Sequence, residues 1–489
     1  MNFALAAASG LLLVLIFPRF SLAWLAPAAL APLLFAIARE PRPLRRFFLG
    51  GVAGVVFWFG VCYWIQFVIT VHGGLHDVVG WAVFLLFCFA KALHMGVFAW
   101  LAGRIVSSAA AAPGIAALWV AIEATHGSLG FAWLALGNAG IEMNLPLRLA
   151  PHTGVYGLSF VFAAMSALLT QALLRQRRRR LLWLCGLPLL ILLPPLPERE
   201  EGRATAVVVQ PNFSESARWT SDRVGQATRR LAYLSMAAAL GAKARKPDLI
   251  VWPEMPAPLY YETDPRFREA VATLARVTRA PVLTGTVAHR PDGSVTNSAM
   301  LISEAGEPVS RYDKIHLVPF GEFVPWPLGF ADKISNETGD FRPGENLVVS
   351  PIDGHRIGAF ICYESVFPRF VRRFALDGAE ALFNLSNDGY FGRSAARDQH
   401  LSIVRMRAAE NRRWVLRATN NGITASIDPA GRVSEALAVE TEAVATMHFS
   451  FIGESTLYTR YGDWFPALCA LIAAALLVWS AVPKYSPEV

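Results

Sequence analysis

The stretch "GHRIGAFICYES" (residues 354–365) joins an apolar run of strand length to a cysteine, Cys362, and a glutamate, Glu364. Near-continuous apolar runs of this kind are typical of strands that are buried on both faces. In layered α/β domains, catalytic side chains gather where strands end and loops begin. Cys362 is therefore a core thiol, half of a disulfide, or a nucleophile. The other cysteines and the charged residues of the chain help to decide among these three roles.

Similar short apolar runs continue on both sides of this stretch. The expected strands are 205–210, 248–254, 281–287, 297–303, 356–364, 381–387, 414–420 and 423–429. Between them, residues 221–244 and 398–413 show helical patterns. Alternation of strands and helices predicts an α/β layered domain over residues 197–462.

The rest of the chain has the composition of a membrane protein. Over the whole chain, 54% of residues are hydrophobic, 17% are charged, and the mean hydropathy is +0.38. The long apolar runs are roughly 3–18, 23–38, 47–70, 78–103, 110–124, 154–174, 181–196 and 464–482. Several reach the ~20 residues that cross a bilayer. We therefore expect about eight transmembrane helices, about seven of them within residues 1–196 and one within 463–489.

The positions of the arginine patches predict the orientation of these helices in the membrane. The patches "REPRPLRR" (39–46) and "RQRRRR" (175–180) border apolar runs, as cytoplasmic loops do. With the N-terminus inside, both patches fall in the cytoplasm and residues 197–462 fall outside. The net charge of +8 is thereby explained as a topology signal, and we expect no nucleic-acid partner.

Cys362 has no cysteine partner in the expected outer domain. The others, at positions 62, 88, 185 and 469, all lie in expected spans, which argues against a disulfide. A thiol that attacks an ester needs a base and an oxyanion-stabilising cation. Glu254 in "VWPE" and Lys314 in "YDKIHLVPFGEFVP" supply these groups, although these residues alone leave an inert core thiol open.

Several phrases resemble those of a known family. The three segments that carry Glu254, Lys314 and Cys362 resemble the signatures of the nitrilase superfamily, which uses a Glu–Lys–Cys triad. Longer phrases are similar to those of its membrane-bound branch, the apolipoprotein N-acyltransferase family. These are "VVQPN" (208–212), "LSNDGYFG" (385–392), "QHLSIVRMRAAE" (399–410), "ATNNGITASIDPAG" (418–431), "GFAWLALGNAG" (130–140) and "GVYGLSF" (154–160).

The resemblance implies an αββα sandwich and a ping-pong acyl transfer. An acyl chain would pass from a phospholipid to Cys362, and then to the α-amine of a diacylglyceryl-cysteine apolipoprotein. Glu254 would be the general base and Lys314 the oxyanion stabiliser. The residues that would support the triad are Glu322, Glu364 and Tyr363. Trp219 would lie at the substrate entrance, and Tyr390 stands where the family often has tryptophan.

The segment "VPFGEFVPWPLGF" (318–330) is rich in aromatic residues and interrupted by proline and glycine. We interpret Phe320, Phe323 and Trp326 as part of a lid at the bilayer interface; ordinary packing under a long loop is the alternative. Lys91 and His94 lie within an apolar run and have no assigned role.

We expect no metal or nucleotide cofactor, because the sequence lacks metal-ligand histidine spacings and phosphate-binding glycine motifs. The expected protein is a monomer of the inner membrane, with its catalytic domain on the periplasmic face. Two other functions are open: a membrane-tethered amidase, and a transporter or lipid-binding scaffold. An intact Glu–Lys–Cys set argues against a scaffold, and the spans lack the broken-helix pairs of transporters.

Overall fold

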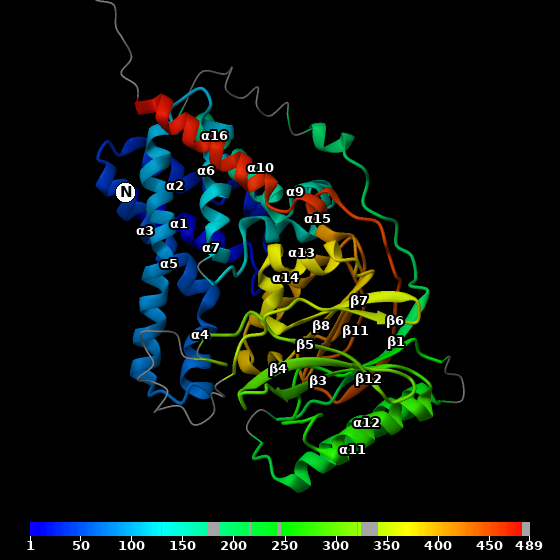
Figure 1. Cartoon of the computed structure of the whole chain (residues 1–489). Helices are drawn as coiled ribbons and strands as arrows, with labels where there is room; N and C mark the ends of the chain where they lie inside the picture. The colour runs from blue at the N-terminus through cyan, green and yellow to red at the C-terminus, as the bar shows by residue number, and fades with distance from the viewer. Residues whose placement is uncertain are drawn as a thin grey trace, which may run out of the picture. The chain divides into compact units, whose positions relative to one another are not determined.

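The computed structural model describes residues 1–128, 130–174, 186, 188–214, 217–241, 246–319, 321–323 and 341–481. They form two compact units (Figure 1). The helical unit comprises Met1–Gln66, Val78–Leu196 and Tyr461–Val489, and the α/β unit comprises Phe67–Asp77 and Pro197–Arg460. The sequence assigns Phe67–Asp77 to the N-terminal membrane part, whereas in the structure this segment packs with the α/β unit.

The helical unit is built from helices of very different lengths, most of them apolar. They are α1 (Asn2–Leu15), η1 (Ala23–Ala28), α2 (Ala31–Arg39), α3 (Pro43–Cys62), α4 (Trp64–Phe67), α5 (Asp77–Ile105), α6 (Ala111–Glu123), α7 (Thr125–Ser128), η3 (Leu136–Glu142), α8 (Asn144–Leu147), α9 (Ala150–Thr153), α10 (Val155–Leu173) and α16 (Trp464–Ala481). Among the described residues, four are long and apolar enough to cross a membrane: α3, α5, α10 and α16.

The expected count of eight spans is not confirmed. The runs 3–18 and 110–124 form helices shorter than a bilayer crossing. The run 23–38 is interrupted, because Pro27 lies within a 3-10 helix and a second proline opens α2. Residues 181–185 and 187 of the run 181–196, among them Cys185, and the patch "RQRRRR" lie outside the described residues.

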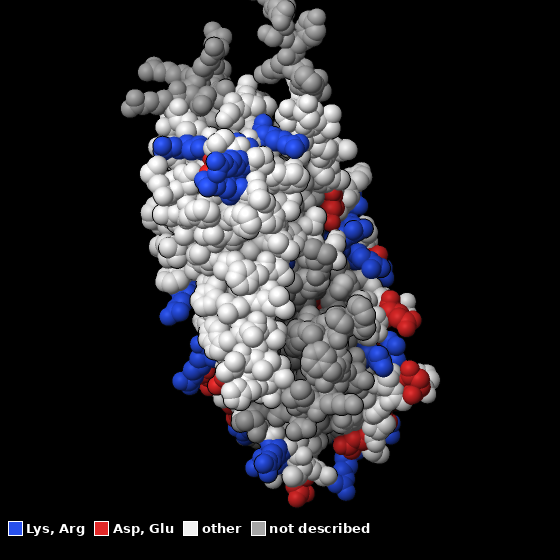
Figure 2. All heavy atoms as spheres, turned by 90° about the vertical axis from the view of Figure 1, so that its left-hand side faces the viewer, with Lys and Arg blue, Asp and Glu red and all other residues white. Residues whose placement is uncertain are grey.

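The long helices expose apolar side chains. Phe48 and Phe59 on α3 and Leu86 and Phe89 on α5 are each more than two-fifths exposed. Figure 2 shows a broad, nearly uncharged surface on this side of the molecule, below a group of Lys and Arg side chains. A soluble monomer rarely exposes so much contiguous apolar surface, whereas a protein embedded in lipid requires it.

The α/β unit contains two six-stranded sheets. The first has the order β12-β1-β2-β3-β4-β5 and the second has the order β11-β10-β9-β8-β7-β6. The strands of the first are β1 (Ala204–Gln210), β2 (Leu249–Val251), β3 (Val282–His289), β4 (Val295–Ile302), β5 (Pro308–Asp313) and β12 (Ala443–Phe449). Those of the second are β6 (Val349–Ile352), β7 (His355–Ile361), β8 (Ala381–Ser386), β9 (Val415–Thr419), β10 (Ala425–Ile427) and β11 (Val433–Ala436).

The two sheets pack face to face between helices. β1 contacts β9 and β4 contacts β7 across the interface. Helices α11 (Ser221–Ala239) and α12 (Pro265–Thr278) cover the first sheet, and α13 (Pro368–Leu376) and α14 (Ala396–Asn411) cover the second. A short helix, α15 (Leu457–Tyr461), closes the unit. The predicted αββα sandwich is confirmed.

Two strands end earlier than the sequence predicts. The strand expected at 248–254 stops at Val251, because Pro253 cannot donate to a strand ladder. The strand expected at 356–364 stops at Ile361, and Cys362 opens a 3-10 helix, η6 (Cys362–Val366). Glu254 and Cys362 therefore lie in the connections beyond the strands.

Candidate active site

Three connections carry the predicted triad. Glu254 follows β2, Lys314 follows β5 directly, and Cys362 follows β7. All three side chains are buried, with exposed fractions of 5% for Glu254, 1% for Lys314 and 6% for Cys362. The central strands β1–β3 and β7–β9 run parallel within their sheets, so their carboxyl ends gather loops at a common edge.

Lys314 lies between two carboxylates. Its Nζ is 2.9 Å from Oε1 of Glu254 and 2.9 Å from Oε2 of Glu322. Burial alone would lower the pKa of Lys314, but the charges of Glu254 and Glu322 raise it well above its ordinary value. Lys314 is therefore a permanent buried cation.

Asn297 on β4 joins the same two carboxylates. Its Nδ2 donates to Oε1 of Glu254 and to Oε1 of Glu322, each at 2.7 Å. Its backbone carbonyl accepts the Lys314 N–H at 2.8 Å. The sequence reasoning missed this residue, although "TNS" (296–298) places three polar side chains within a buried strand.

Glu364 ties the cysteine segment to the lysine segment. Oε1 accepts the Tyr312 hydroxyl at 2.6 Å and the N–H groups of Ile315 and His316 at 2.7 and 3.1 Å. Oε2 accepts the Ile361 N–H at 2.7 Å. Burial raises the pKa of Glu364 to about 7 even though these donors oppose the rise. Its position fixes the segments that hold Lys314 and Cys362.

Cys362 has a strained backbone and a neutral thiol. Its φ of +49° lies in the left-handed region, which non-glycine residues avoid. Burial and the charge of Glu254 raise the pKa of its thiol well above the ordinary range, against the opposing effects of Lys314 and of a hydrogen-bond contact with the Ser386 side chain. Such a thiol reacts only if a base removes its proton. All four cysteines among the described residues are free.

The other predicted site residues fall in different places. Tyr363 is buried and packs its ring against Phe367. Trp219 is half-buried with Phe213 against the core beneath α11 and α12. Tyr390 is half-buried, with its ring 4.5 Å from that of His72, and Phe323 is half-buried. Phe320 and Trp326 lie outside the described residues, so the lid stays a prediction.

Lys91 and His94 lie within the helical unit. Nζ of Lys91 is 2.5 Å from Nδ1 of His126 and donates to the carbonyl of Phe131 at 2.9 Å. The same ammonium lies 4.8 Å from the ring centroid of Trp58, and the ring of His94 stacks on His126. Lys91 is thus held by polar and aromatic partners from its own unit.

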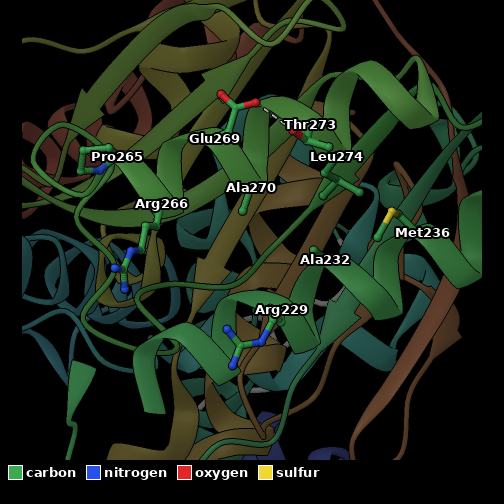
Figure 3. Close-up of a pocket in the computed structure, with 9 residues that line it drawn as sticks. All are labelled: Arg229, Ala232, Met236, Pro265, Arg266, Glu269, Ala270, Thr273 and Leu274. Carbon is green, nitrogen blue, oxygen red and sulfur yellow. Dashed lines mark hydrogen bonds between the residues drawn. The ribbon is translucent and has the colours of Figure 1, made fainter. Parts of the chain in front are cut away.

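A groove of about 590 Å³ opens between α11 and α12 (Figure 3). Arg229, Ala232 and Met236 line it from α11, and residues from Pro265 to Leu274 line it from α12. Glu269 accepts a hydrogen bond from Thr273 at its edge. No triad residue lines this groove. Across the described residues, no cluster of three or more His, Cys, Asp or Glu side chains could hold a metal ion.

Comparison with known proteins matches both units. Residues 205–454 match the carbon-nitrogen hydrolase family, and residues 9–168 match the apolipoprotein N-acyltransferase N-terminal domain. Apolipoprotein N-acyltransferases from Geobacter metallireducens and Pseudomonas putida are 34% and 30% identical to the chain. Each alignment covers 97% of this chain, and 94% and 95% of the respective relatives.

A solved structure also matches, that of Saccharomyces cerevisiae Nit3, a member of branch 10 of the nitrilase superfamily. It is 18% identical, with a TM-score of 0.40 over 50% of this chain and 90% of the yeast protein. The agreement of both family models and of relatives along nearly the full length leads to one assignment. The chain belongs to the apolipoprotein N-acyltransferase family, and its α/β unit to the carbon-nitrogen hydrolases.

Proposed function

We propose that the chain transfers a fatty acyl group from a membrane phospholipid to the α-amine of a diacylglyceryl-cysteine apolipoprotein, through a thioester on Cys362. The observation that supports it best is the buried group of Glu254, Lys314, Glu322 and Asn297 beside the neutral thiol. This group supplies a base and a fixed cation in one water-poor site.

Glu254 has one lone-pair position left for a proton. A carboxylate offers about four acceptor positions. Oε1 is occupied by Lys314 at 2.9 Å and Asn297 at 2.7 Å, and Oε2 accepts the Asn387 N–H at 2.9 Å. The remaining position on Oε2 is the one from which Glu254 takes the proton of the Cys362 thiol.

In the first half-reaction, the Cys362 thiolate attacks the ester carbonyl carbon of the phospholipid. One N–H of Lys314 points at Glu254 and another at Glu322, so the third is available to the oxyanion. The C–O bond breaks, and Glu254 returns the proton to the leaving lysophospholipid oxygen. A thioester remains on the enzyme.

In the second half-reaction, the α-amine of the apolipoprotein attacks the thioester carbon. Glu254 accepts the amine proton, the C–S bond breaks, and the proton passes to the departing thiolate. The product is an amide and the free cysteine is restored. The low exposure of Lys314 and Cys362 supports aminolysis over hydrolysis, because little water reaches the acyl group.

The placement of the chain follows the same proposal. Residues 1–196 and 463–489 hold about eight transmembrane helices of the inner membrane. Residues 197–462 form the catalytic domain on the periplasmic face. Arginine patches on the inner side and the four long apolar helices support this arrangement.

The test is the intact mass of the purified full-length chain after incubation with phospholipid alone. We expect wild type to gain one fatty-acyl mass, which neutral hydroxylamine removes and a diacylated lipopeptide discharges as N-acyl product. Cys469→Ser is the matched control and should be acylated like wild type, because Cys469 is a buried free cysteine in the helical unit.

Cys362→Ser should form no hydroxylamine-sensitive adduct. If wild type stays unmodified while it hydrolyses soluble amides, the tethered-amidase function replaces the acyltransferase. If Cys469→Ser loses the adduct and Cys362→Ser keeps it, the assignment of the nucleophile is wrong.

A further inference from the structure

Three charged or titratable side chains lie together inside the α/β unit, and the proposed reaction does not use them. Asp388 belongs to η7 (Asp388–Phe391), His400 to α14 and Arg417 to β9, and all three are fully buried. Nη2 of Arg417 lies 2.7 Å from each oxygen of Asp388, and Nδ1 of His400 lies 3.1 Å from Oδ1. Because burying such charges is costly, their retention calls for a role.

This group contacts the backbone of the nucleophile. Nε2 of His400 is 3.1 Å from the carbonyl oxygen of Cys362 and 2.8 Å from Oγ of Ser365. On the preceding residue, the Ile361 N–H is held by Glu364 at 2.7 Å. The backbone at Cys362 therefore has a side-chain partner before the residue, at the Ile361 N–H, and another at the Cys362 carbonyl. A strained residue keeps its conformation only when its surroundings fix it in this way.

The same group also reaches the sulfur. Burial raises the pKa of the Cys362 thiol, and a hydrogen-bond contact between that thiol and the Ser386 side chain lowers it. Oγ of Ser386 lies 3.0 Å from Oδ1 of Asp388 and 3.3 Å from Nη2 of Arg417. One ion pair therefore supports the nucleophile twice, at Sγ through Ser386 and at the carbonyl through His400.

The two ring nitrogens of His400 have different partners. Burial and the charge of Arg417 lower the pKa of His400, so the ring is neutral and carries one proton. Two acceptors compete for this proton, each 3.1 Å away: the Cys362 carbonyl at Nε2 and Oδ1 of Asp388 at Nδ1. Asp388 already accepts from Arg417 at both of its oxygens, and Nη2 of Arg417 lies 3.1 Å from Nδ1, where it can donate to the ring. These contacts favour the proton on Nε2, facing the Cys362 carbonyl.

We propose that His400, held as the Nε2–H tautomer by Arg417 and Asp388, is a positioning residue that aims Cys362 at the ester carbonyl. It touches neither acyl group nor amine, and acts through the peptide of the nucleophile. The role rests on the proposed function of Cys362 as the acylated residue.

Two substitutions test the contacts of the two ring nitrogens separately. In His400→Gln the side-chain amide stands where Nε2 stood and can still donate to the Cys362 carbonyl. In His400→Asn the amide stands where Nδ1 stood and the carbonyl loses its donor. We expect His400→Gln to acylate Cys362 within about threefold of the wild-type single-turnover rate. His400→Asn should be slower by about tenfold or more, because a small displacement of a reacting atom lowers the rate of the chemical step strongly.

The final amount of acyl-enzyme gives the number of folded, acylatable molecules in each sample. The single-turnover rate constant is then compared between variants independently of that number. A role in folding alone would lower the amplitude of both variants and leave the rate unchanged, which would overturn the proposal. So would a His400→Asn rate equal to that of wild type, or a slower reaction of His400→Gln than of His400→Asn.

The tautomer itself is measured without lipid. In full-length protein labelled with ¹⁵N at histidine, the ring signals that disappear in His400→Gln belong to His400. They should show a protonated Nε2 and a bare Nδ1 between pH 6 and 8. A proton on Nδ1 would overturn the inference whatever the activity. Failure of the wild type to form any acyl-enzyme would instead contradict the proposed function, and the tautomer result would still hold.

Discussion

The replacement Glu364→Gln should change how folding stability depends on pH. Two effects act on the Glu364 carboxyl in opposite directions: complete burial disfavours its charge, and four hydrogen-bond donors favour it. Burial prevails and raises the pKa from its ordinary value of 4.5 to about 7. A tenfold change in proton binding corresponds to about 1.4 kcal/mol, so the rise is worth about 3 kcal/mol.

The sign follows from linkage. The folded protein binds this proton more tightly than the unfolded chain does, so its contribution to stability is complete below about pH 4.5 and is lost as the pH rises through 7. Glutamine has no proton to lose. Its amide group must instead face one of the four donors, which costs about 1–3 kcal/mol at every pH.

The assay is urea unfolding of the detergent-solubilised full chain, followed by near-ultraviolet circular dichroism at pH 5 and pH 9. The free energy of unfolding should fall from pH 5 to pH 9 by about 3 kcal/mol more in wild type than in Glu364→Gln. All other titrating groups cancel in this double difference. Equal pH dependence in the two proteins would refute the reasoning, because it would mean that the four donors balance burial.

Three further substitutions probe the same site. Asn297→Leu removes two donors from buried carboxylates and should lower the free energy of unfolding by about 2–4 kcal/mol, as urea titration would reveal; an unchanged midpoint would contradict the bridging role. Lys314→Met leaves the carboxylates of Glu254 and Glu322 without their shared cation and should lower the free energy of unfolding by about 3–5 kcal/mol in the same titration; an unchanged midpoint would contradict the buried ion pairs. Cys362→Gly should be about 1 kcal/mol more stable than Cys362→Ala, because glycine adopts a φ of +49° without strain; comparable thermal midpoints for the two would argue that the turn is relaxed.

The sequence predicted an α/β layered domain because its central strands are continuous apolar runs, and the sandwich arrangement was implied by the family resemblance. Edge strands were missed for a physical reason. β5 and β11 have alternating or mostly exposed side chains and polar compositions, so they differ little from loops. The helices α12 and α13 were missed as well, although proline opens each of them and marks a helix start.

The residues of the candidate site were found through their resemblance to a family, and their convergence could not be derived. Glu254 accepts a hydrogen bond from Asn387, which lies 133 positions further along the chain. No local pattern encodes such a contact. One residue does signal a buried polar group in the sequence. Arg417 is a charged residue inside an apolar strand, so it must have a buried partner.

The segment Phe67–Asp77 belongs to the α/β unit although it lies between two membrane-type helices in the sequence. The ring of His72 packs on Tyr390, and Phe67 lies against Gly392, where a Cβ would come within 2.8 Å of its ring. The α/β unit is therefore not encoded by one continuous stretch of the gene. A chimera that exchanges residues 197–460 between relatives has to carry this segment along, and drift at positions 67 and 72 is tied to drift at 390 and 392.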